Sequence, residues 1–331
     1  MELDILKCIF EKFQHVSNFS AGIEIKSGHI NDTYLIKTDN KPSYILQRIN
    51  HLVFKDVPAL IANKVLLSKH LEAKSNKKTK AGSEYQFLQL VQNKNGKYYH
   101  LDESNNYWNL MIYIENSQTF DIVPNAEVAY EAGKLFGDFL SLTADLKASK
   151  LNVVIPGFHD MNHRFEQFDM AFQKATTERR LKAKELTDKV LFRKDEMLIL
   201  QQLKSTGKIS NRVTHNDTKI SNALFSMDNK AICVIDTDTV MPGILHYDFG
   251  DAIRTICNTA AEDEADLNKV NFNFEYYEAY KKGFLEKFSN SMTQTEIKYL
   301  PLSVKTMIFI IALRFLTDYL NDDIYFKTEY E

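Results

Sequence analysis

The sequence predicts an α+β fold in two lobes, a small antiparallel-sheet N-lobe and a mainly helical C-lobe. The chain has 331 residues, and chains of this length commonly divide into two compact parts. Near the start, three β-prone segments alternate with turn-rich stretches, at residues 22–26, 33–37 and 44–49. From Glu127 onwards, apolar residues recur with a helical period instead. We therefore expect a small N-terminal sheet lobe over residues 1–115 and a helical C-terminal lobe over residues 116–331.

The remaining elements follow from the same two periods. In the first lobe, we expect helices at residues 4–16 and 58–72 and further strands at residues 85–92 and 107–115. In the second lobe, the stretch after Glu127 aligns its apolar residues along one stripe, at Val128, Leu135, Phe139 and Leu142. Later helices are expected at residues 160–174, 178–204, 270–288 and 294–320.

The composition excludes several classes of function. Hydrophobic residues make up 44% of the chain and charged residues 26%, and the formal net charge is -3. Such a chain is typical of a soluble globular protein without the basic surface that nucleic acid requires. The N-terminus lacks the basic start and apolar core of a secretion signal, and the longest apolar run, Met307–Leu313, is far shorter than the roughly 20 residues that span a bilayer. We expect a cytoplasmic enzyme that needs no nucleic acid, membrane or protein partner.

A β-hairpin carries the candidate metal ligands. Residues 221–225 and 231–236 are apolar and β-prone, and a turn-forming Asp-Asn pair lies between them. If Phe225 opposes Ala231, paired positions sum to an even number, and Asn222 and Asp236 then share one face. Diagonal neighbours on one face have Cα atoms roughly 7 to 8 Å apart, which leaves room for one cation between two side-chain oxygens. Because Mg2+ keeps several waters and is completed by substrate phosphates, Asn222 and Asp236 are sufficient as predicted metal ligands.

The loop before this hairpin supplies the candidate base. His215, Asp217 and Asn222 form the pattern HxDxxxxN, and Asp236 follows 19 positions after Asp217. This set supplies a base, an amide ligand and a carboxylate ligand, as phosphoryl transfer requires. Asp217 is the predicted catalytic residue, because a carboxylate in this loop can accept the proton of an attacking hydroxyl. His215 is expected to brace the loop, and Asp238 is left open between a second metal contact and a turn cap.

A second acidic motif follows. Residues 248–250 spell DFG, the metal-binding signature of protein kinases, but they lie 31 positions after the candidate base. Asp236 lies closer to that base and ends a strand, so it is the better candidate ligand. The acids of the second motif, Asp248 and Asp251, are expected to cap or brace a helix that begins near Ala252, with the arginine that follows as a partner.

Several segments resemble a known family. HNDTKISN, CVIDTDTVMPG and YDFGDAIR are similar to motifs of the aminoglycoside phosphotransferase and choline kinase superfamily, and within it of the N-acetylhexosamine 1-kinases. Further similar segments, spread over nearly the whole chain, are GHINDTYLI, YILQRIN, IPGFHD and RFLTDYLNDDIYFK. The resemblance implies a protein-kinase-like two-lobed fold that uses ATP and Mg2+ to phosphorylate a small hydroxylated acceptor. For the closer subgroup, the acceptor is the anomeric hydroxyl of GlcNAc or GalNAc.

The resemblance also implies that the first lobe holds the nucleotide, in the turn before the second strand and in a hinge segment near residues 113–115. Protein kinases carry a lysine on the third strand, where this chain has Gln47 and Arg48 instead. Arg48 would supply the missing charge, but alternation along the strand leaves the inward face open. The next helix lacks a glutamate before Glu72, which puts the lysine–glutamate pair of protein kinases in doubt. The predicted nucleotide contacts are Gly28, Asn31, Thr33, Arg48, Tyr113 and Glu115.

The acceptor must lie against Asp217, so its other contacts are expected from the helical lobe. His159 and Arg164, which follow a Pro-Gly-Phe turn, are candidates. By resemblance to the sugar 1-kinases, Arg314 and Tyr325 are further sugar contacts. An equal alternative for Arg314 is an ion pair one helical turn away, with the carboxylate at position 318.

Two other functions stay open. The acceptor of such a kinase could instead be an aminoglycoside, choline, homoserine or methylthioribose. The missing lysine–glutamate pair also motivates a non-catalytic nucleotide-binding module, although the intact Asp217, Asn222 and Asp236 argue against it.

Overall fold

The computed structural model describes residues 2–26, 30–78, 85–260 and 264–326. The chain forms two compact units, each assembled from three segments. The first unit comprises Met1–Thr119, Leu142–Ile155 and Asn222–Pro242, and the second comprises Phe120–Ser141, Pro156–Ser221 and Gly243–Glu331. The hairpin with the candidate metal ligands thus belongs to the first unit, and Asp217 belongs to the second. The predicted lobe boundary after residue 115 stays a prediction.

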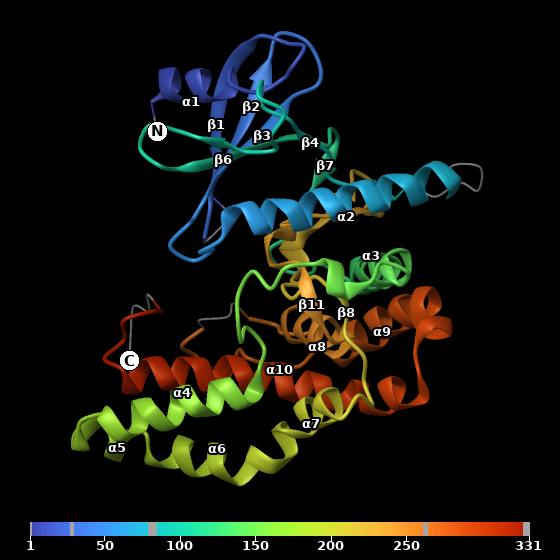
Figure 1. The fold of residues 1–331 in the computed structure, drawn as a ribbon. Helices are drawn as coiled ribbons and strands as arrows, with labels where there is room; N and C mark the ends of the chain where they lie inside the picture. The colour runs from blue at the N-terminus through green and yellow to red at the C-terminus, as the bar shows by residue number, and fades with distance from the viewer. Residues whose placement is uncertain (1, 27–29, 79–84, 261–263, 327–331) are drawn as a thin grey trace. The chain divides into compact units, whose positions relative to one another are not determined.

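The first unit contains a six-stranded antiparallel sheet (Figure 1). Its order is β1-β2-β3-β6-β4, and β5 also pairs with β6. The strands are β1 (Phe19–Ile25), β2 (Asp32–Thr38), β3 (Tyr44–Ile49), β4 (Leu90–Val91), β5 (His100–Leu101) and β6 (Tyr107–Ile112). The predicted strands are confirmed with shifted ends, except that the strand expected at residues 85–92 is wrong over most of its length.

One face of this sheet packs against helix α1 (Leu3–Phe10). The contact is apolar and buried, and its members include Phe10, Leu46, Trp108 and Leu110. The helix is shorter than predicted because the chain after it pairs through its backbone with the segment after β4. The Gln14 N–H donates to the Gln92 carbonyl at 2.8 Å. Helix α2 (Val57–Lys78) also belongs to the first unit.

The first unit also contains a small three-stranded sheet with the order β10-β9-β7. Its strands are β7 (Ser117–Gln118), β9 (Ala223–Ser226) and β10 (Ala231–Val234). Strands β9 and β10 are antiparallel, so the predicted hairpin is confirmed. Short 3-10 turns lie at η2 (Ala148–Lys150), η3 (Ile220–Asn222) and η4 (Thr237–Thr239).

The second unit is mainly helical. Its helices are α3 (Ala126–Thr143), which runs two residues past the unit's segment, α4 (Met161–Lys174), α5 (Thr177–Lys182), α6 (Lys184–Met197), α7 (Ile199–Ser205), α8 (Leu245–Ile256), α9 (Phe274–Phe288) and α10 (Gln294–Leu320), with a 3-10 turn η5 (Ser289–Ser291). Strand β8 (Arg212–Thr214) precedes the Asp217 loop, and β11 (Met241–Gly243), whose first two residues belong to the first unit, leads into α8. The single helix predicted at residues 178–204 is wrong, because the chain turns at Ala183 and Leu198, where Ala183 is buried in the core.

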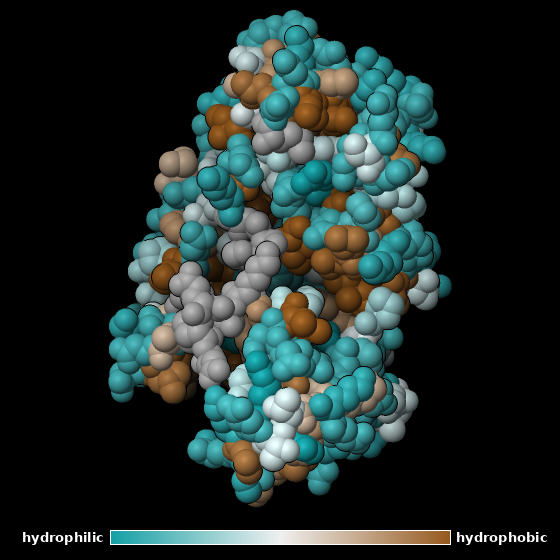
Figure 2. All heavy atoms as spheres, turned by 90° about the vertical axis from the view of Figure 1, so that its left-hand side faces the viewer, coloured by the Kyte–Doolittle hydropathy of each residue, from teal (hydrophilic) through white to brown (hydrophobic). Residues whose placement is uncertain are grey.

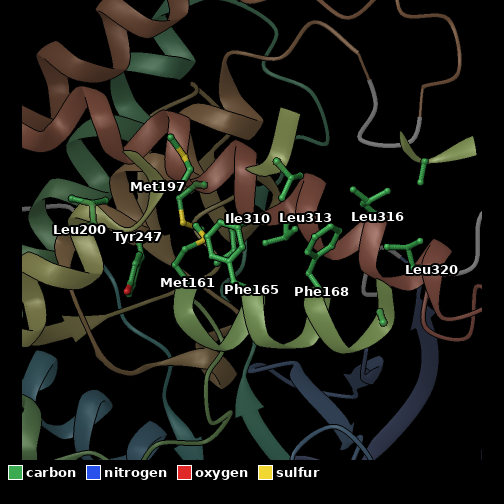
Figure 3. Close-up of a cluster of buried hydrophobic side chains, with 14 of the residues drawn as sticks. Met161, Phe165, Phe168, Met197, Leu200, Tyr247, Ile310, Leu313, Leu316 and Leu320 are labelled. Carbon is green, nitrogen blue, oxygen red and sulfur yellow. The ribbon is translucent and has the colours of Figure 1, made fainter. Parts of the chain in front are cut away.

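The core of the second unit surrounds helix α10. Figure 3 shows Ile310 and Leu313 of this helix beside Phe165 and Phe168 of α4, and Leu316 further along α10 belongs to the same cluster. The predicted α+β fold, with an antiparallel sheet near the N-terminus and a helical C-terminal part, is confirmed.

Helix α10 is also the one described helix that is long and apolar enough to cross a membrane. This is weak evidence, because 39% of its most apolar window is buried inside the protein and the core helix of a soluble protein passes the same test. On the face drawn in Figure 2, hydrophilic residues predominate and hydrophobic ones lie between them in small groups. The expected absence of a membrane role stays a prediction.

Helices α3 and α9 cross at glycine residues, and this crossing allows a test of packing. A Cβ atom at Gly133 would lie 2.2 Å from the Tyr280 carbonyl oxygen. Gly133→Ala is therefore expected to lower the free energy of unfolding by about 2 kcal/mol. Overpacking against a backbone atom costs about 3 kcal/mol, the upper end of the usual range, and the higher helix propensity of alanine returns about 1 kcal/mol. Urea denaturation measures the change. Gly207→Ala is the control, because that position is open and has only a positive φ of 71°; an equal loss in both variants would contradict the packing argument.

Candidate active site

The β9–β10 hairpin does not keep the regular register that the sequence predicts. Phe225 faces Ala231 as expected, but Ala223 faces Val234. The sum of paired positions therefore changes from even to odd between these two pairs, because a β-bulge adds one residue to one strand. Beyond the bulge, alternation no longer assigns a side chain to the face that a regular ladder would give it.

The bulge changes the position of the two predicted metal ligands. The Ile235 N–H donates to the Asn222 carbonyl at 2.9 Å, so these residues are opposite each other. The argument from a regular ladder that put Asn222 and Asp236 on one face is therefore wrong. Asp236 leaves the strand in a left-handed conformation, with φ 55° and ψ 54°, at the start of η4. Non-glycine residues in this region are uncommon and cluster at functional sites, so the turn rather than the pleat directs this side chain.

The donor atoms of this segment suit a hard divalent cation. Asn222 offers an amide oxygen and Asp236 a carboxylate oxygen, which are ligand types that Mg2+ accepts. In the described part of the chain, no cluster of three or more His, Cys, Asp or Glu residues could hold a metal ion. A cation bound through these two residues would therefore depend on water and substrate phosphates for its remaining ligands.

In the second unit, the backbone around Asp217 is held in a fixed shape. Asn216 has a φ of 64°, and its Nδ2 donates to the Thr214 carbonyl at 3.1 Å. The Asp217 N–H donates to Nδ1 of His215 at 3.3 Å. The Asp217 side chain is 29% exposed, and its Oδ2 lies 3.3 Å from Nζ of Lys219. The carboxylate can therefore be reached from solvent although its backbone is fixed.

The His215 side chain is fully buried. The rings of Phe136 and Phe139 contact it edge-on, with centroids 6.3 and 6.0 Å away. A buried ring that accepts the Asp217 N–H supports the predicted bracing role.

Two carboxylates of helix α8 hold the same loop. Asp248 accepts the backbone N–H groups of His215 at 2.9 Å and of Asn216 at 2.7 Å. Asp251 accepts the N–H of Thr218 at 3.0 Å. Burial raises the pKa of Asp248 to about 6. These acids thus fix the loop on both sides of Asp217.

The predicted start of this helix near Ala252 is wrong. Helix α8 begins at Leu245, and Asp248 and Asp251 lie inside it. Almost every residue of the helix is buried, so no polar stripe marks its start in the sequence. The predicted pairing of Asp251 with Arg254 is confirmed, with Nη2 2.9 Å from Oδ1.

His159 and Arg164, two of the predicted acceptor contacts, belong to the second unit. The His159 side chain is buried, and its Nε2 lies 3.0 Å from the Asn216 carbonyl. The pKa of His159 is lowered to about 3, mainly by burial and also by the charges of Arg314 and Arg164, although the bond to Asn216 and the charge of Asp217 raise it. The imidazole is therefore neutral and donates its Nε2 proton to the loop. Both arginines lie near this side chain, because each contacts Phe158, the residue before it.

Arg164 and Arg314 bring two positive charges to this region. Arg164 donates to the Phe158 carbonyl through Nη2 at 2.7 Å. Burial, followed by the charge of Arg314, lowers the pKa of Arg164 to about 10. The Arg314 guanidinium lies 5.9 Å from the ring centre of Phe158 and 5.8 Å from that of Tyr325. Aromatic rings stabilise a cation at such distances.

The alternative ion pair between Arg314 and Asp318 is not formed. Asp318 instead accepts the N–H of Tyr325 at 2.9 Å and that of Phe326 at 2.7 Å. This folds the segment after α10 back toward the helix and brings two aromatic rings to Arg314.

The predicted nucleotide contacts belong to the first unit. Gly28 lies outside the described residues. The Asn31 side chain donates to Asp238 at 2.7 Å and accepts the Asn50 N–H at 2.9 Å, and Thr33 pairs with Gln47 across β2 and β3. In the hinge segment, the Tyr113 N–H donates to the Ser43 carbonyl and Glu115 lies 3.8 Å from Lys41. The nucleotide roles of these residues stay predictions.

The structure distinguishes the two faces of strand β3 that alternation left open. Arg48 donates to Asp32 through Nε at 2.6 Å and lies over the ring of Trp108. Trp108 belongs to the apolar contact between the sheet and helix α1, so Arg48 is on that face. Gln47 points to the other face, where its Oε1 lies 3.4 Å from Nζ of Lys64. The positive charge on that face comes from a residue that sequence reasoning missed.

Lys64 occupies an apolar position of helix α2. Leu60 and Leu67, one turn before and one turn after it, are both buried. The Lys64 Nζ lies 2.5 Å from Oδ1 of Asp238, and both side chains are almost fully buried. A lysine in the apolar stripe of a helix was the available signal, since an interior charge requires a partner.

Comparison with known proteins identifies the fold and the family. Similar solved structures include amicoumacin kinase hAmiN in complex with AMP-PNP, Ca2+ and Ami, with a TM-score of 0.63, 13% identity, and coverage of 100% of this chain and 96% of that chain. The microcompartment-associated aminopropanol kinase has a TM-score of 0.58, 13% identity and coverage of 97% and 94%. A spectinomycin phosphotransferase in complex with ADP and spectinomycin has a TM-score of 0.55 and 11% identity, with coverage of 98% of this chain and 91% of that chain. These likenesses confirm the kinase-like fold.

The family follows from a separate comparison. The model of the phosphotransferase enzyme family matches residues 22–281, well over half of the chain. The chain belongs to this family. The predicted superfamily is thereby confirmed, whereas the closer resemblance to N-acetylhexosamine 1-kinases stays a prediction.

Proposed function

We propose that this protein is an ATP- and Mg2+-dependent kinase that phosphorylates the anomeric hydroxyl of an N-acetylhexosamine, GlcNAc or GalNAc. Membership of the phosphotransferase enzyme family supports transfer of a phosphoryl group. The observation that carries the acceptor class is the pair of guanidinium groups of Arg164 and Arg314. Both contact Phe158, which precedes the buried His159 beside the Asp217 loop.

This charge pattern favours a neutral acceptor over a cationic one. Aminoglycosides, choline, ethanolamine and aminopropanol are cations at neutral pH, and two guanidinium groups would repel them. An N-acetylhexosamine is uncharged because its nitrogen is acylated. Its hydroxyl and carbonyl oxygens can accept hydrogen bonds from guanidinium N–H groups. The aromatic rings of Phe158 and Tyr325 around Arg314 offer apolar surface for a sugar ring.

The proposed chemistry is mainly positioning and charge neutralisation. Asp217 orients the acceptor hydroxyl and takes its proton as the hydroxyl oxygen bonds to the γ-phosphorus of ATP and the bond from that phosphorus to ADP breaks. Asn222 and Asp236 hold Mg2+, which neutralises charge on the nucleotide phosphates when bound. Asp248 and Asp251 keep the Asp217 loop in its shape through the bonds to its backbone.

A panel of acceptors tests this assignment. The protein is incubated with ATP, Mg2+ and either neutral sugars or cationic amino alcohols and aminoglycosides, and ADP release is measured. We expect turnover with N-acetylhexosamines, and turnover with cationic acceptors that is lower by at least about fivefold, since one repelled unit charge costs about 1 kcal/mol or more at 4 Å.

The position of the phosphate is then read from the reducing end of the consumed sugar. Phosphate on the anomeric oxygen abolishes reducing power and is labile in mild acid. ATP turnover that leaves the reducing end intact, or turnover with cationic acceptors alone, would reject the 1-kinase assignment while leaving the phosphotransferase family unaffected.

A further inference from the structure

The buried pair of Lys64 and Asp238 reverses the arrangement of charges known from protein kinases. There, a strand lysine pairs with a helix glutamate. Here the lysine is on helix α2, strand β3 presents the neutral Gln47, and the acid follows strand β10. The side chains of Lys64 and Asp238 are 1% and 2% exposed, so the charges are shielded from water and depend on each other.

Asp238 joins three parts of the first unit. Its Oδ1 bonds Lys64 of α2, and its Oδ2 accepts Nδ2 of Asn31 in the turn before β2 at 2.7 Å. The neighbouring helix residue adds a second connection, because Nδ2 of Asn63 donates to the Val240 carbonyl at 2.9 Å. Two successive residues of α2 thus hold the segment that follows Asp236.

Burial and charge both indicate that this contact is specific. Removing one partner of a buried ion pair leaves an uncompensated charge, which costs far more than the pair itself contributes. A pair of apolar residues would stabilise a helix–loop contact as well, so stability alone does not require charges here. The distinctive effect of the charges is geometric, because a carboxylate that is bonded on both oxygens fixes the direction of its backbone.

We propose that Lys64 is a positioning residue for the metal site. By holding Asp238, it fixes the turn η4 and the left-handed backbone of Asp236, two positions earlier, so that the Asp236 carboxylate is presented to Mg2+. It also neutralises Asp238, so that Asp236 is the acid of this turn that is available to the cation. This inference rests on the proposed function, because that function assigns Mg2+ to Asn222 and Asp236.

Lys64 acts on the metal site through Asp238, and it does not bind the nucleotide phosphates. Its Nζ is buried and already contacts the oxygens of Asp238 and Gln47. The inference therefore separates two quantities. Loss of Lys64 should weaken Mg2+ binding, and nucleotide binding without metal should remain.

The test uses three variants of the full chain: Lys64→Met, the double variant Lys64→Met with Asp238→Asn, and the control Lys69→Met. Methionine keeps the length of the side chain without its charge, and Lys69 lies on the same helix but is exposed over Tyr98. Calorimetry measures the binding of AMP-PNP in EDTA and across a Mg2+ titration, and thermal denaturation reports the stability of each variant.

We expect Lys64→Met to raise the Mg2+ concentration for half-maximal AMP-PNP binding by about 10- to 100-fold, as for other residues that support a metal ligand. Binding in EDTA should change by less than about twofold, since a contact that the ligand does not make contributes nothing to its affinity. The double variant removes both buried charges, so it should recover stability and retain the Mg2+ defect. It also provides the decisive measurement if the single variant does not fold.

Three results would overturn the inference. Unchanged Mg2+ dependence in Lys64→Met, or its recovery together with stability in the double variant, would show that the pair has a structural role only. A loss of AMP-PNP binding in EDTA would make Lys64 a phosphate contact. If the unmodified protein itself shows no Mg2+-dependent binding of AMP-PNP, the proposed function fails as well, which distinguishes the two failures.

Discussion

Asp217→Asn is expected to lower kcat by about 10²- to 10⁴-fold, because general base catalysis contributes a factor of this size. Asparagine keeps the shape of the side chain but cannot take the proton of the acceptor hydroxyl. The backbone of the loop is held by His215, Asp248 and Asp251, none of which bonds the Asp217 carboxylate in the contacts described above. The loop should therefore keep its shape. Steady-state kinetics with the best acceptor of the panel measures kcat.

Nucleotide binding provides the first control for this variant, since AMP-PNP affinity should stay within about twofold when only the proton acceptor is lost. Asp195→Asn is the matched substitution, because Asp195 is exposed on helix α6. It makes the same change of charge in the second unit and should leave kcat unaltered. Near-normal turnover by Asp217→Asn would exclude Asp217 as the base, whatever the acceptor is.

The sequence predicts the elements of this fold well where one period extends over many residues. Helix α10 has the predicted bounds, and β3 does also. Errors occur where tertiary contacts compete with local pattern. Helix α1 ends early because backbone bonds to Gln92 take over, and the long helix expected before β8 divides where Ala183 enters the core. These contacts are distant in sequence, so no local period reports them.

The candidate site divides in the same way. The motif that identifies Asp217, Asn222 and Asp236 consists of residue types and of their spacing along the chain, and the sequence contains both. The bulge between Ala231 and Cys233 is different, because nothing in the alternation of apolar residues marks it. The orientation of Asp236 therefore depends on backbone geometry that the sequence does not specify.

The source of the buried positive charge also depends on tertiary contacts. Gln47 and Arg48 show that the strand lysine is missing, but neither residue indicates that its replacement lies on a helix. Lys64 follows Gln47 by 17 positions and lies on a helix, and its partner Asp238 follows Lys64 by 174 positions. Pairing over such separations follows from the fold, so only the lysine in an apolar helix stripe could have indicated it.

Asp248→Asn is expected to lower kcat by about 10²-fold, although Asp248 has no proposed contact with substrate. Its two oxygens accept the N–H groups of His215 and Asn216, one each. Asparagine has one oxygen, and its NH2 group would meet the other N–H, which leaves buried donors facing each other. The left-handed Asn216 then loses support, and a shift of Asp217 by about 1 Å costs about 10²-fold in rate. Steady-state kinetics checks the loss, with Asp195→Asn as the control.

The pH dependence of stability tests the same residue independently of activity. Burial raises the pKa of Asp248 to about 6 from its ordinary 3.8, so this group's contribution to stability is fully present below about pH 3.8 and is lost as pH rises through about 6. Two pH units of separation correspond to about 3 kcal/mol. Unfolding in urea at several pH values should therefore show that the free energy of unfolding of the unmodified protein, relative to Asp248→Asn, falls by up to that amount between pH 4 and pH 7.

The same titration predicts an acidic limit to activity. Below about pH 6 the carboxyl of Asp248 is protonated, and the proton competes with one of the two backbone N–H groups for its oxygens. The kcat of the unmodified protein should therefore fall at acidic pH with a midpoint near pH 6 as the loop loosens, and Asp248→Asn should show a low kcat without this acidic fall. If Asp248→Asn instead keeps both the wild-type rate and the acidic fall, the loop around Asp217 holds its shape without the Asp248 carboxylate, and a different group titrates.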